Sequence, residues 1–261
     1  MAQKMNKYGL KRNIPTHIKR EIRKRCGFGC VRCGFGWYDY EHFDPDYCDA
    51  TEHNPNKMTL LCMSCNQKRN RGILSRESVI EANKNPKCLE EGFANEQFDY
   101  GSSPIEVIIG ECRFINCQHI LCINNEPILT IKNPEEENDT FLLSGKFFNS
   151  EGIKIFEIKN NQWFGDINNW DIECVGKKIK IKENESTNTL TIRQEPPHSF
   201  IIEKIDMFYK NARIVLDRNI LKIMTSDGQK IKTEATLLST GIVGANIGID
   251  IKDDSIGLFI V

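Results

Sequence analysis

Four cysteines in two closely spaced pairs constrain this chain more than any other feature. The pairs are CVRC at residues 30–33 and CMSC at residues 62–65, with 28 residues between them. Two CxxC pairs supply four thiolates, the set that closes a tetrahedral structural zinc site. The gap is longer than the roughly 15 to 20 residues of a plain double-CxxC module, and the extra length gives room for a β-hairpin. We therefore predict one structural Zn²⁺, held by Cys30, Cys33, Cys62 and Cys65.

Composition places the chain among ordinary globular proteins. It has 261 residues, of which 39% are hydrophobic and 27% are charged, enough for two modest domains that each bury a core. No stretch approaches the 18 or so apolar residues of a membrane span, and the polar opening lacks the apolar core of a signal peptide. The seven cysteines outside the two pairs show no repeated spacing, which favours reduced thiols. We therefore expect a cytoplasmic protein with no membrane partner.

Charge is distributed unevenly along the chain. Residues 1–87 carry 17 Lys and Arg against 9 Asp and Glu, a net charge of +8, whereas residues 88–261 carry 18 against 27, a net charge of −9. Opposed halves of this kind indicate that only the first half meets a polyanion. Because the acidic half repels DNA, we expect a fragment of residues 1–95 to bind unrelated DNA more tightly than the full chain at low salt.

The first residues predict an arm and a helix. Residues 1–13 are polar and basic with no hydrophobic period, which is typical of a mobile arm. After Pro15, a helical pattern begins in which Ile18, Ile22 and Cys26 recur on one face. We therefore expect a short helix with one apolar side and one basic side.

The segment around the cysteine pairs predicts a hairpin followed by helices. An aromatic run at residues 37–40 and an apolar run at residues 58–61 are typical of two strands. A helix is expected from about Asn66, and a second one has Ser75 as a plausible N-cap. Residues 86–104 show no clear period, so we place the domain boundary there.

From residue 105 onward the chain consists of short β-prone runs in which apolar and polar residues alternate. Examples are residues 106–109, 128–131, 154–158, 178–181, 189–192 and 221–223. The pattern predicts an all-β domain over residues 105–261 with sandwich-like sheets, and a β-solenoid is the alternative. We expect this domain to target or regulate the first one, through a protein partner or a ligand that the sequence does not identify. The fold class predicted for the whole chain is α+β.

The segments around the cysteine pairs resemble the HNH endonucleases. The matching text is GCVRCG at residues 29–34, YEHFDP at 40–45 and LLCMSCNQK at 60–68. The resemblance covers about residues 14–86, and as a set these motifs are specific. It implies the ββα-metal fold for a domain at residues 1–95. It also implies metal-dependent hydrolysis of phosphodiester bonds in DNA.

Glu41, His42 and Asn66 have the side chains that this chemistry needs. A neutral imidazole near pH 7 can take a proton from water, which makes His42 the candidate general base. Glu41 and Asn66 offer hard oxygen ligands for Mg²⁺ or Mn²⁺, and the resemblance assigns the same roles to these positions. Glu41 stands where Asp is more usual, and Asn66 stands where many members have His. Adjacent residues of a regular strand point to opposite faces, so Glu41 and His42 serve one site only if the strand is irregular there, as the family's fold implies.

The resemblance also implies a middle asparagine that orients the base. This position falls on Lys57, nine residues before Asn66, and the nearest asparagine is Asn56. We therefore favour Asn56 as the orienting residue. His53 lies in the same loop, where a plain loop histidine is the simpler interpretation and contact with metal or phosphate is the alternative.

Basic residues indicate where a polyanion binds. Glu21 is the only acid in residues 1–33, against ten Lys and Arg, which is more than solubility requires. We therefore favour phosphate contact over a merely solvated helix face. The predicted contacts are Lys19, Arg20, Arg23, Lys24, Lys68, Arg69 and Arg71.

The sequence thus predicts a zinc-stabilised nuclease with a catalytic Mg²⁺ or Mn²⁺ and DNA as its substrate. Two alternatives stay open. One is a non-catalytic zinc module that binds nucleic acid and has no use for Glu41, His42 and Asn66. The other is a nuclease directed at RNA. DNA specificity, nicking against double-strand cleavage, pathway and oligomeric state do not follow from the sequence.

Overall fold

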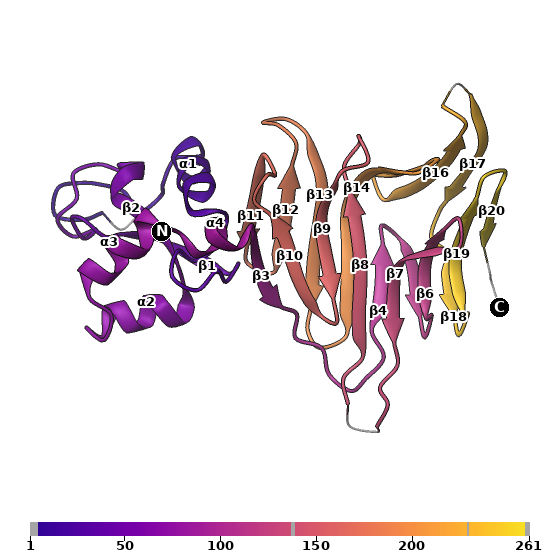
Figure 1. Cartoon of the computed structure of the whole chain (residues 1–261), viewed down its shortest axis with the longest axis horizontal. Helices are drawn as coiled ribbons and strands as arrows, with labels where there is room; N and C mark the ends of the chain where they lie inside the picture. The colour runs from indigo at the N-terminus through magenta and orange to yellow at the C-terminus, as the bar shows by residue number, and fades with distance from the viewer. Residues whose placement is uncertain (1–4, 137–138, 229, 259–261) are drawn as a thin grey trace. The chain divides into compact units, whose positions relative to one another are not determined.

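The computed structural model describes residues 5–136, 139–228 and 230–258. The chain divides into two compact units, whose elements are labelled in Figure 1. The first unit comprises residues 1–96 and 165–175, and the second comprises residues 97–164 and 176–261. The division after residue 96 falls in the segment where the sequence places the boundary. The return of residues 165–175 to the first unit has no counterpart in the sequence prediction.

Four helices and a two-stranded hairpin build most of the first unit. Its elements are α1 (Thr16–Cys26), β1 (Tyr38–His42), a 3₁₀ turn (Pro55–Lys57), β2 (Met58–Cys62), α2 (Met63–Asn70), α3 (Arg76–Lys84), α4 (Lys87–Glu91), β3 (Phe93–Gln97, at the division) and β11 (Asp171–Val175). β1 and β2 pair antiparallel, from Tyr38 opposite Cys62 to His42 opposite Met58. The predicted hairpin is therefore present, and α2 follows β2 directly.

One apolar face holds α1 in the unit. Ile22 and Cys26 are buried, and Ile18 packs against the same core, as the spacing predicts. The helix ends at Gly27, whose φ of 70° lets its N–H reach two carbonyl groups of the last turn. The core continues through β2, in which every residue is buried. Among the described residues, none of the helices has the length and apolar character needed to cross a membrane.

Residues 5–14 pack against the first unit. Nδ2 of Asn6 donates to two main-chain carbonyl groups in residues 47–50, each at 2.7 Å, and Ile14 is buried in the core. The expectation of a mobile arm is therefore wrong for the described part of this segment, because its polar groups find fixed main-chain partners. Residues 1–4 lie outside the described residues.

Strands make up the second unit. They are β4 (Glu106–Ile109), β5 (Cys112–Ile115), β6 (His119–Ile123), β7 (Glu126–Lys132), β8 (Leu142–Phe148), β9 (Lys154–Lys159), β10 (Gln162–Asp166), β12 (Lys178–Lys182), β13 (Asn188–Glu195), β14 (Ser199–Tyr209), β15 (Ala212–Asp217), β16 (Ile220–Ser226), β17 (Ile231–Leu237), β18 (Gly241–Val243), β19 (Ile247–Lys252) and β20 (Ser255–Leu258). One sheet has the order β20-β19-β6-β7-β8-β9-β10. The other contains β12-β13-β14-β15-β16-β17, with β4 beside β14 and β5 between β4 and β18. Each of the six β-prone runs named from the sequence lies in one of these strands.

Strands that follow one another in sequence mostly pair antiparallel. Asparagines with positive φ form several of the tight turns between them, at Asn124–Asn125, Asn160–Asn161 and Arg218–Asn219. Two-residue hairpin turns require this backbone conformation, which asparagine tolerates. Antiparallel hairpins favour layered sheets over the parallel stacking of a β-solenoid. The chain as a whole is mostly β with few helices.

Apolar side chains of both sheets meet in the second unit. Ile109, Ile202 and Leu221 from one sheet and Leu129 and Phe147 from the other border a small void of about 20 Å³. Strands such as β8, β12, β15 and β16 alternate buried and more accessible residues, and the buried faces of the two sheets form this core. The alternation in the sequence therefore predicts the core correctly.

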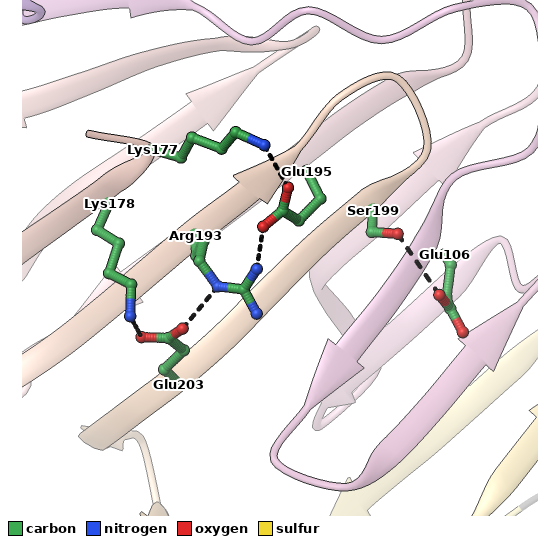
Figure 2. A network of polar contacts seen from close by, with 7 residues as sticks. All are labelled: Glu106, Lys177, Lys178, Arg193, Glu195, Ser199 and Glu203. Carbon is green, nitrogen blue, oxygen red and sulfur yellow. Dashed lines mark hydrogen bonds and ion pairs between the residues drawn. The ribbon is translucent and has the colours of Figure 1, made fainter.

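Ion pairs cross the solvent-exposed side of the second sheet (Figure 2). Lys178 on β12 and Arg193 on β13 both contact Glu203 on β14, and each nitrogen lies 2.7 Å from a carboxylate oxygen. Lys177 contacts Glu195 in the same way at 2.5 Å. Exposed pairs of this kind contribute about 0.2 to 1 kcal/mol each. Their charged side chains lie on the face of the sheet opposite the apolar core.

Candidate metal centres and polar cleft

Cys30, Cys33, Cys62 and Cys65 come together in the first unit. Their sulfur atoms all lie within 4.8 Å of one another, with 3.5 Å between Cys33 and Cys62 and 3.9 Å between Cys33 and Cys65. Tetrahedral Zn–S bonds of about 2.3 Å place sulfur atoms about 3.8 Å apart, so the four thiols are compatible with a structural zinc site. Cys33 is partly exposed and the other three are buried, which suits a closed site.

Hydrogen bonds prepare this cluster for a cation. The Sγ of Cys62 accepts from the N–H of Cys65 at 3.4 Å and caps α2. A hydrogen bond from the Cys33 thiol lowers the pKa of Cys30, with help from main-chain groups of Cys62 and Arg32 and against the effect of burial, and the same hydrogen bond raises the pKa of Cys33. Thiolate is the form that zinc binds. The cluster thereby joins the segment before β1 to the junction of β2 and α2.

This junction brings Asn66 to the carboxylate of Glu41. Nδ2 of Asn66 lies 2.7 Å from Oε1 of Glu41 and 3.4 Å from Oδ2 of Asp39. Asp39 and Glu41 are two residues apart on β1, so the same face of the strand presents both to α2. Burial raises the pKa of Glu41, and the hydrogen bond from Asn66 opposes this rise. A cation beside the carboxylate would offset the cost of burying its charge.

Glu41 and Asn66 also fit a hard divalent cation chemically. Carboxylate and carboxamide oxygens are ligands that Mg²⁺ and Mn²⁺ accept. Turning the Asn66 carboxamide by half a turn exchanges its oxygen and nitrogen positions and places Oδ1 beside Glu41. The pair then presents two oxygens to one ion.

His42, the last residue of β1, contacts a second histidine. Its Nε2 lies 3.2 Å from Nδ1 of His53, whose Nε2 lies 2.8 Å from the carbonyl oxygen of Lys11. Burial and then the neighbouring His53 lower the pKa of His42 to about 4, and the main chain of Glu52 opposes this shift. The His42 ring is therefore neutral at pH 7, the state in which imidazole accepts a proton.

The hydrogen bond between His53 and the carbonyl of Lys11 decides which of the two imidazole rings carries the proton that lies between them. A neutral His53 that donates from Nε2 to Lys11 has an acceptor at Nδ1, so the shared proton then belongs to His42. With its proton on Nε2, a neutral His42 has its free lone pair on Nδ1. In this arrangement the contact with His53 therefore sets the tautomer of His42.

Glu41 and His42 line the same cleft, which has a volume of about 410 Å³. Arg12, Asp46, Tyr47 and Arg69 also border it. β1 keeps its regular pairing as far as His42, so the ladder lacks the irregularity that the resemblance implies. The strand ends at His42, and its ring turns to the following loop, where it contacts Tyr47 as well as His53. The end of the strand lets two adjacent residues reach one cleft.

Asn56 lies in the 3₁₀ turn before β2 with its side chain exposed. Its N–H donates to Oδ1 of Asn54 at 3.0 Å. Within the described parts of the chain, no hydrogen bond joins Asn56 to His42. The side chain that contacts His42 is that of His53, so the expected contact between Asn56 and His42 is not found among the described residues, and an orienting role for Asn56 stays a prediction.

Arg23 of α1 is buried in an ion pair. It is 1% exposed, and its Nε and one terminal nitrogen lie 2.8 and 2.6 Å from the two carboxylate oxygens of Asp171. The other terminal nitrogen donates to the hydroxyl of Tyr40 at 2.6 Å and lies 3.6 Å from Glu173. The phosphate contact expected for Arg23 is therefore wrong, because residues 165–175 supply its partners inside the unit.

The other basic residues of α1 are partly engaged. The guanidinium group of Arg20 lies 3.6 Å from the ring centre of Trp170 and donates to its carbonyl. Lys24 donates to two main-chain carbonyl groups in residues 165–175. Lys19 lies over the ring of Tyr40. Phosphate contact by Lys19, Arg20 and Lys24 stays a prediction.

The remaining predicted phosphate contacts lie on or just after α2. Lys68 and Arg71 are exposed. Arg69 borders the cleft but lies 2.9 Å from Asp46, which also contacts Arg76 at 2.7 Å. The charge of Arg69 is therefore partly offset where it stands, and phosphate contact by these three residues also stays a prediction.

Arg12 and Tyr47 are among the cleft residues that the sequence analysis did not identify. Arg12 belongs to a basic segment without a pattern, and Tyr47 lies in an irregular loop. The excess of basic residues near the N-terminus was the available signal for Arg12. No sequence signal marks Tyr47.

Comparison with known proteins gives no relative from which a function could be inferred. No protein-family model, no curated protein and no solved structure matches the chain.

Proposed function

We propose that this chain is a metal-dependent HNH-type endonuclease that hydrolyses phosphodiester bonds in DNA. His42 acts as the general base, and Glu41 and Asn66 hold Mg²⁺ or Mn²⁺. The four cysteines hold a structural zinc ion. One observation carries the proposal: His42 and Glu41 share a cleft of about 410 Å³, and Asn66 lies 2.7 Å from Glu41.

The order of the local elements supports the ββα-metal assignment. β1 supplies Glu41 and His42, β2 returns the chain, and α2 supplies Asn66. Cys62 and Cys65 lie at the start of α2, so zinc binding fixes the helix that carries Asn66. Structural zinc contributes about 10 to 16 kcal/mol of apparent binding free energy in small modules, which is ample to hold this geometry.

The chain's own groups cover the needs of hydrolysis. Neutral His42 accepts a proton from the attacking water. Glu41 and Asn66 hold the cation, which when bound supplies charge stabilisation at the phosphate and at the leaving 3′ oxygen. The walls formed by Tyr47 and Arg69 limit how a phosphate can enter the cleft.

Charge near the N-terminus supports a nucleic acid as substrate. Residues 1–33 carry ten Lys and Arg against one acid, and residues 1–87 carry a net charge of +8. We assign catalysis to the first unit, which contains these residues. For the second unit, which has 18 Lys and Arg against 21 Asp and Glu, we propose targeting or regulation through a protein partner or ligand.

Plasmid cleavage tests the proposal. Purified protein is incubated with supercoiled DNA and Mg²⁺ or Mn²⁺, with parallel RNA of the same sequence. Brief EDTA treatment is the control, with zinc content measured to show that the cysteine site stays loaded. Metal-dependent loss of supercoiled DNA is expected. Binding without cleavage under all metal conditions would mean a non-catalytic zinc module, and cleavage of the RNA alone would mean an RNA-directed nuclease.

A further inference from the structure

We propose that Arg12 binds the scissile phosphate and stabilises its charge during cleavage. The inference rests on the proposed nuclease function and gives residues 5–14 a direct part in the site. It adds a third kind of group to the cleft, beside the base and the metal ligands.

The main chain on both sides of Arg12 is fixed to the first unit. The hydroxyl of Tyr47 donates to the carbonyl of Leu10 at 2.7 Å, and Nε2 of His53 lies 2.8 Å from the carbonyl oxygen of Lys11. On the other side, Ile14 is buried in the core. The main chain is therefore held on both sides of Arg12. This limits the entropy that is lost when the Arg12 side chain binds a ligand.

The side chain of Arg12 lies at the reacting groups. It borders the 410 Å³ cleft and an adjoining hollow of about 150 Å³, both of which Glu41, His42 and Tyr47 also line. Its guanidinium carbon lies 5.1 Å from the ring centre of Tyr47, a cation–π distance that holds the group against one wall. A phosphate that reaches His42 and Glu41 must therefore pass close to Arg12.

The charge of Arg12 is available to a ligand. Arg69, which also borders the cleft, lies 2.9 Å from Asp46. In the described part of the chain, no ion pair involves Arg12, and its side chain is exposed. A guanidinium group presents up to five N–H donors in a planar fork that matches phosphate oxygens. Arg12 is thus the cleft arginine that is not held in a direct ion pair among the described residues, although its charge reaches the Glu41 carboxylate and opposes the rise in the pKa of that group.

The experiment uses the full chain with Arg12→Gln and Arg12→Lys. The matched control is Arg218→Gln, which removes an exposed arginine in the turn between β15 and β16 that has no ion pair among the described residues. In a His42→Ala background without added Mg²⁺ or Mn²⁺, binding to a 30-base-pair duplex is titrated with salt. Loss of one phosphate contact lowers the salt slope by about 0.9. We expect this change for Arg12→Gln and the parent slope for Arg218→Gln.

Cleavage gives the second readout. With His42 present and Mn²⁺ added, Arg12→Gln is expected to lower kcat about 10²-fold, as removal of one charge-stabilising donor does in other active sites. Arg12→Lys keeps the charge and is expected to lose less. Zinc content should match the parent in every variant.

The outcomes separate this inference from the proposed function. An unchanged salt slope for Arg12→Gln overturns the phosphate contact, whatever the cleavage rate. Cleavage by Arg12→Gln within threefold of the parent overturns the catalytic part and leaves the nuclease function standing. Failure of the unmutated chain to cleave DNA overturns the nuclease function, and the salt slope then decides the phosphate contact alone.

Discussion

Nε2 of His42 lies 3.2 Å from Nδ1 of His53, which links the end of β1 to the loop before β2. The other nitrogen of His53 faces the carbonyl of Lys11, so one imidazole connects the proposed base to residues 5–14. A general base works only with its lone pair free and aimed at water. His53 is therefore a positioning residue, which acts through His42.

Replacing His42 and replacing His53 should have non-additive effects on the rate of DNA cleavage. His42→Ala is expected to lower the cleavage rate about 10²- to 10⁴-fold, and His53→Ala about tenfold because it disturbs only the orientation and protonation of His42. The double variant should cleave no more slowly than His42→Ala, since His53 has nothing left to position. Rates on a labelled duplex at saturating DNA measure this. A double variant slowed by the product of the two effects would show that His53 acts independently.

Zinc should be required for the first unit to fold. Cys62→Ser removes one thiolate and the cap of α2, so it is expected to abolish zinc binding and expose the amides of β2 to hydrogen exchange. Cys48→Ser is the matched control, because Cys48 is exposed and lies outside the cluster. Metal analysis and hydrogen exchange together test this. A zinc-free chain with protected β2 amides would contradict the assignment.

Asp171 should stabilise the first unit from a distance of 148 residues in sequence. Asp171→Asn leaves the buried charge of Arg23 poorly compensated, which costs about 3 to 5 kcal/mol for a buried pair. Replacing both partners, Arg23→Met with Asp171→Leu, should recover most of this loss. Hydrogen exchange of the α1 amides gives the free energy of opening, with exposed Asp139→Asn as the control. Equal stability of Asp171→Asn and the parent would show that the pair contributes nothing.

The same ion pair changes what a truncation can test. A fragment of residues 1–95 lacks residues 165–175, so Arg23 would lose both its carboxylate partner and the segment that covers it. Tighter DNA binding by such a fragment would then report an incomplete first unit with a newly uncovered arginine, as well as the loss of the acidic residues beyond position 95. Variants of the full chain in which surface acids are replaced by neutral residues test the effect of charge on DNA affinity without removing residues 165–175.

Local patterns predict most of the hairpin and helix elements. The CxxC spacing brings Cys30, Cys33, Cys62 and Cys65 together, and periodicity gives the buried face of α1. The partner of Arg23 could not be predicted, since an amphipathic pattern shows which face is polar but not which distant segment covers it. Residues 5–14 were missed for a related reason. Their contacts are separate hydrogen bonds, an ion pair between Lys7 and Asp49 and the burial of Ile14, which leave no period in the sequence.

The site itself is predicted only in part. Glu41 and Asn66 come together as their motif suggests, 2.7 Å apart. The contact with His42 falls to His53 rather than Asn56, because loop residues 43–57 follow no repeat from which side-chain directions could be inferred. Their positions depend on tertiary contacts, such as those of Asn6 with residues 47–50.

In the second unit, Glu126 should make stability depend on pH. It accepts a hydrogen bond from Tyr209 at 2.7 Å and lies 3.1 Å from both Lys146 and Lys210, and these groups, Tyr209 first, lower its pKa to about 2. A carboxyl with a lowered pKa stabilises the fold above its unfolded pKa, near 4.5, and this contribution is lost as the pH falls toward 2.

Glu126→Gln is therefore expected to destabilise the second unit by about 1 kcal/mol at pH 7, the scale of a partly exposed ion pair. The difference from the parent should shrink below pH 4.5 and vanish only below about pH 2, where the parent carboxyl also becomes mostly neutral. Urea unfolding at a series of pH values measures it. A difference that stays constant from pH 7 to pH 2 would exclude an ionic origin.

One comparison of cleavage rates tests the nuclease assignment most directly. Cleavage of a labelled DNA duplex in Mn²⁺ or Mg²⁺ is measured for the parent chain, for His42→Ala and for His17→Ala, which removes an exposed histidine of α1 outside the cleft. The account predicts cleavage by the parent and by His17→Ala, and at least 10²-fold slower cleavage by His42→Ala with the same zinc content and DNA affinity. Equal rates for the parent and His42→Ala, or no cleavage by the parent in either metal, would contradict it.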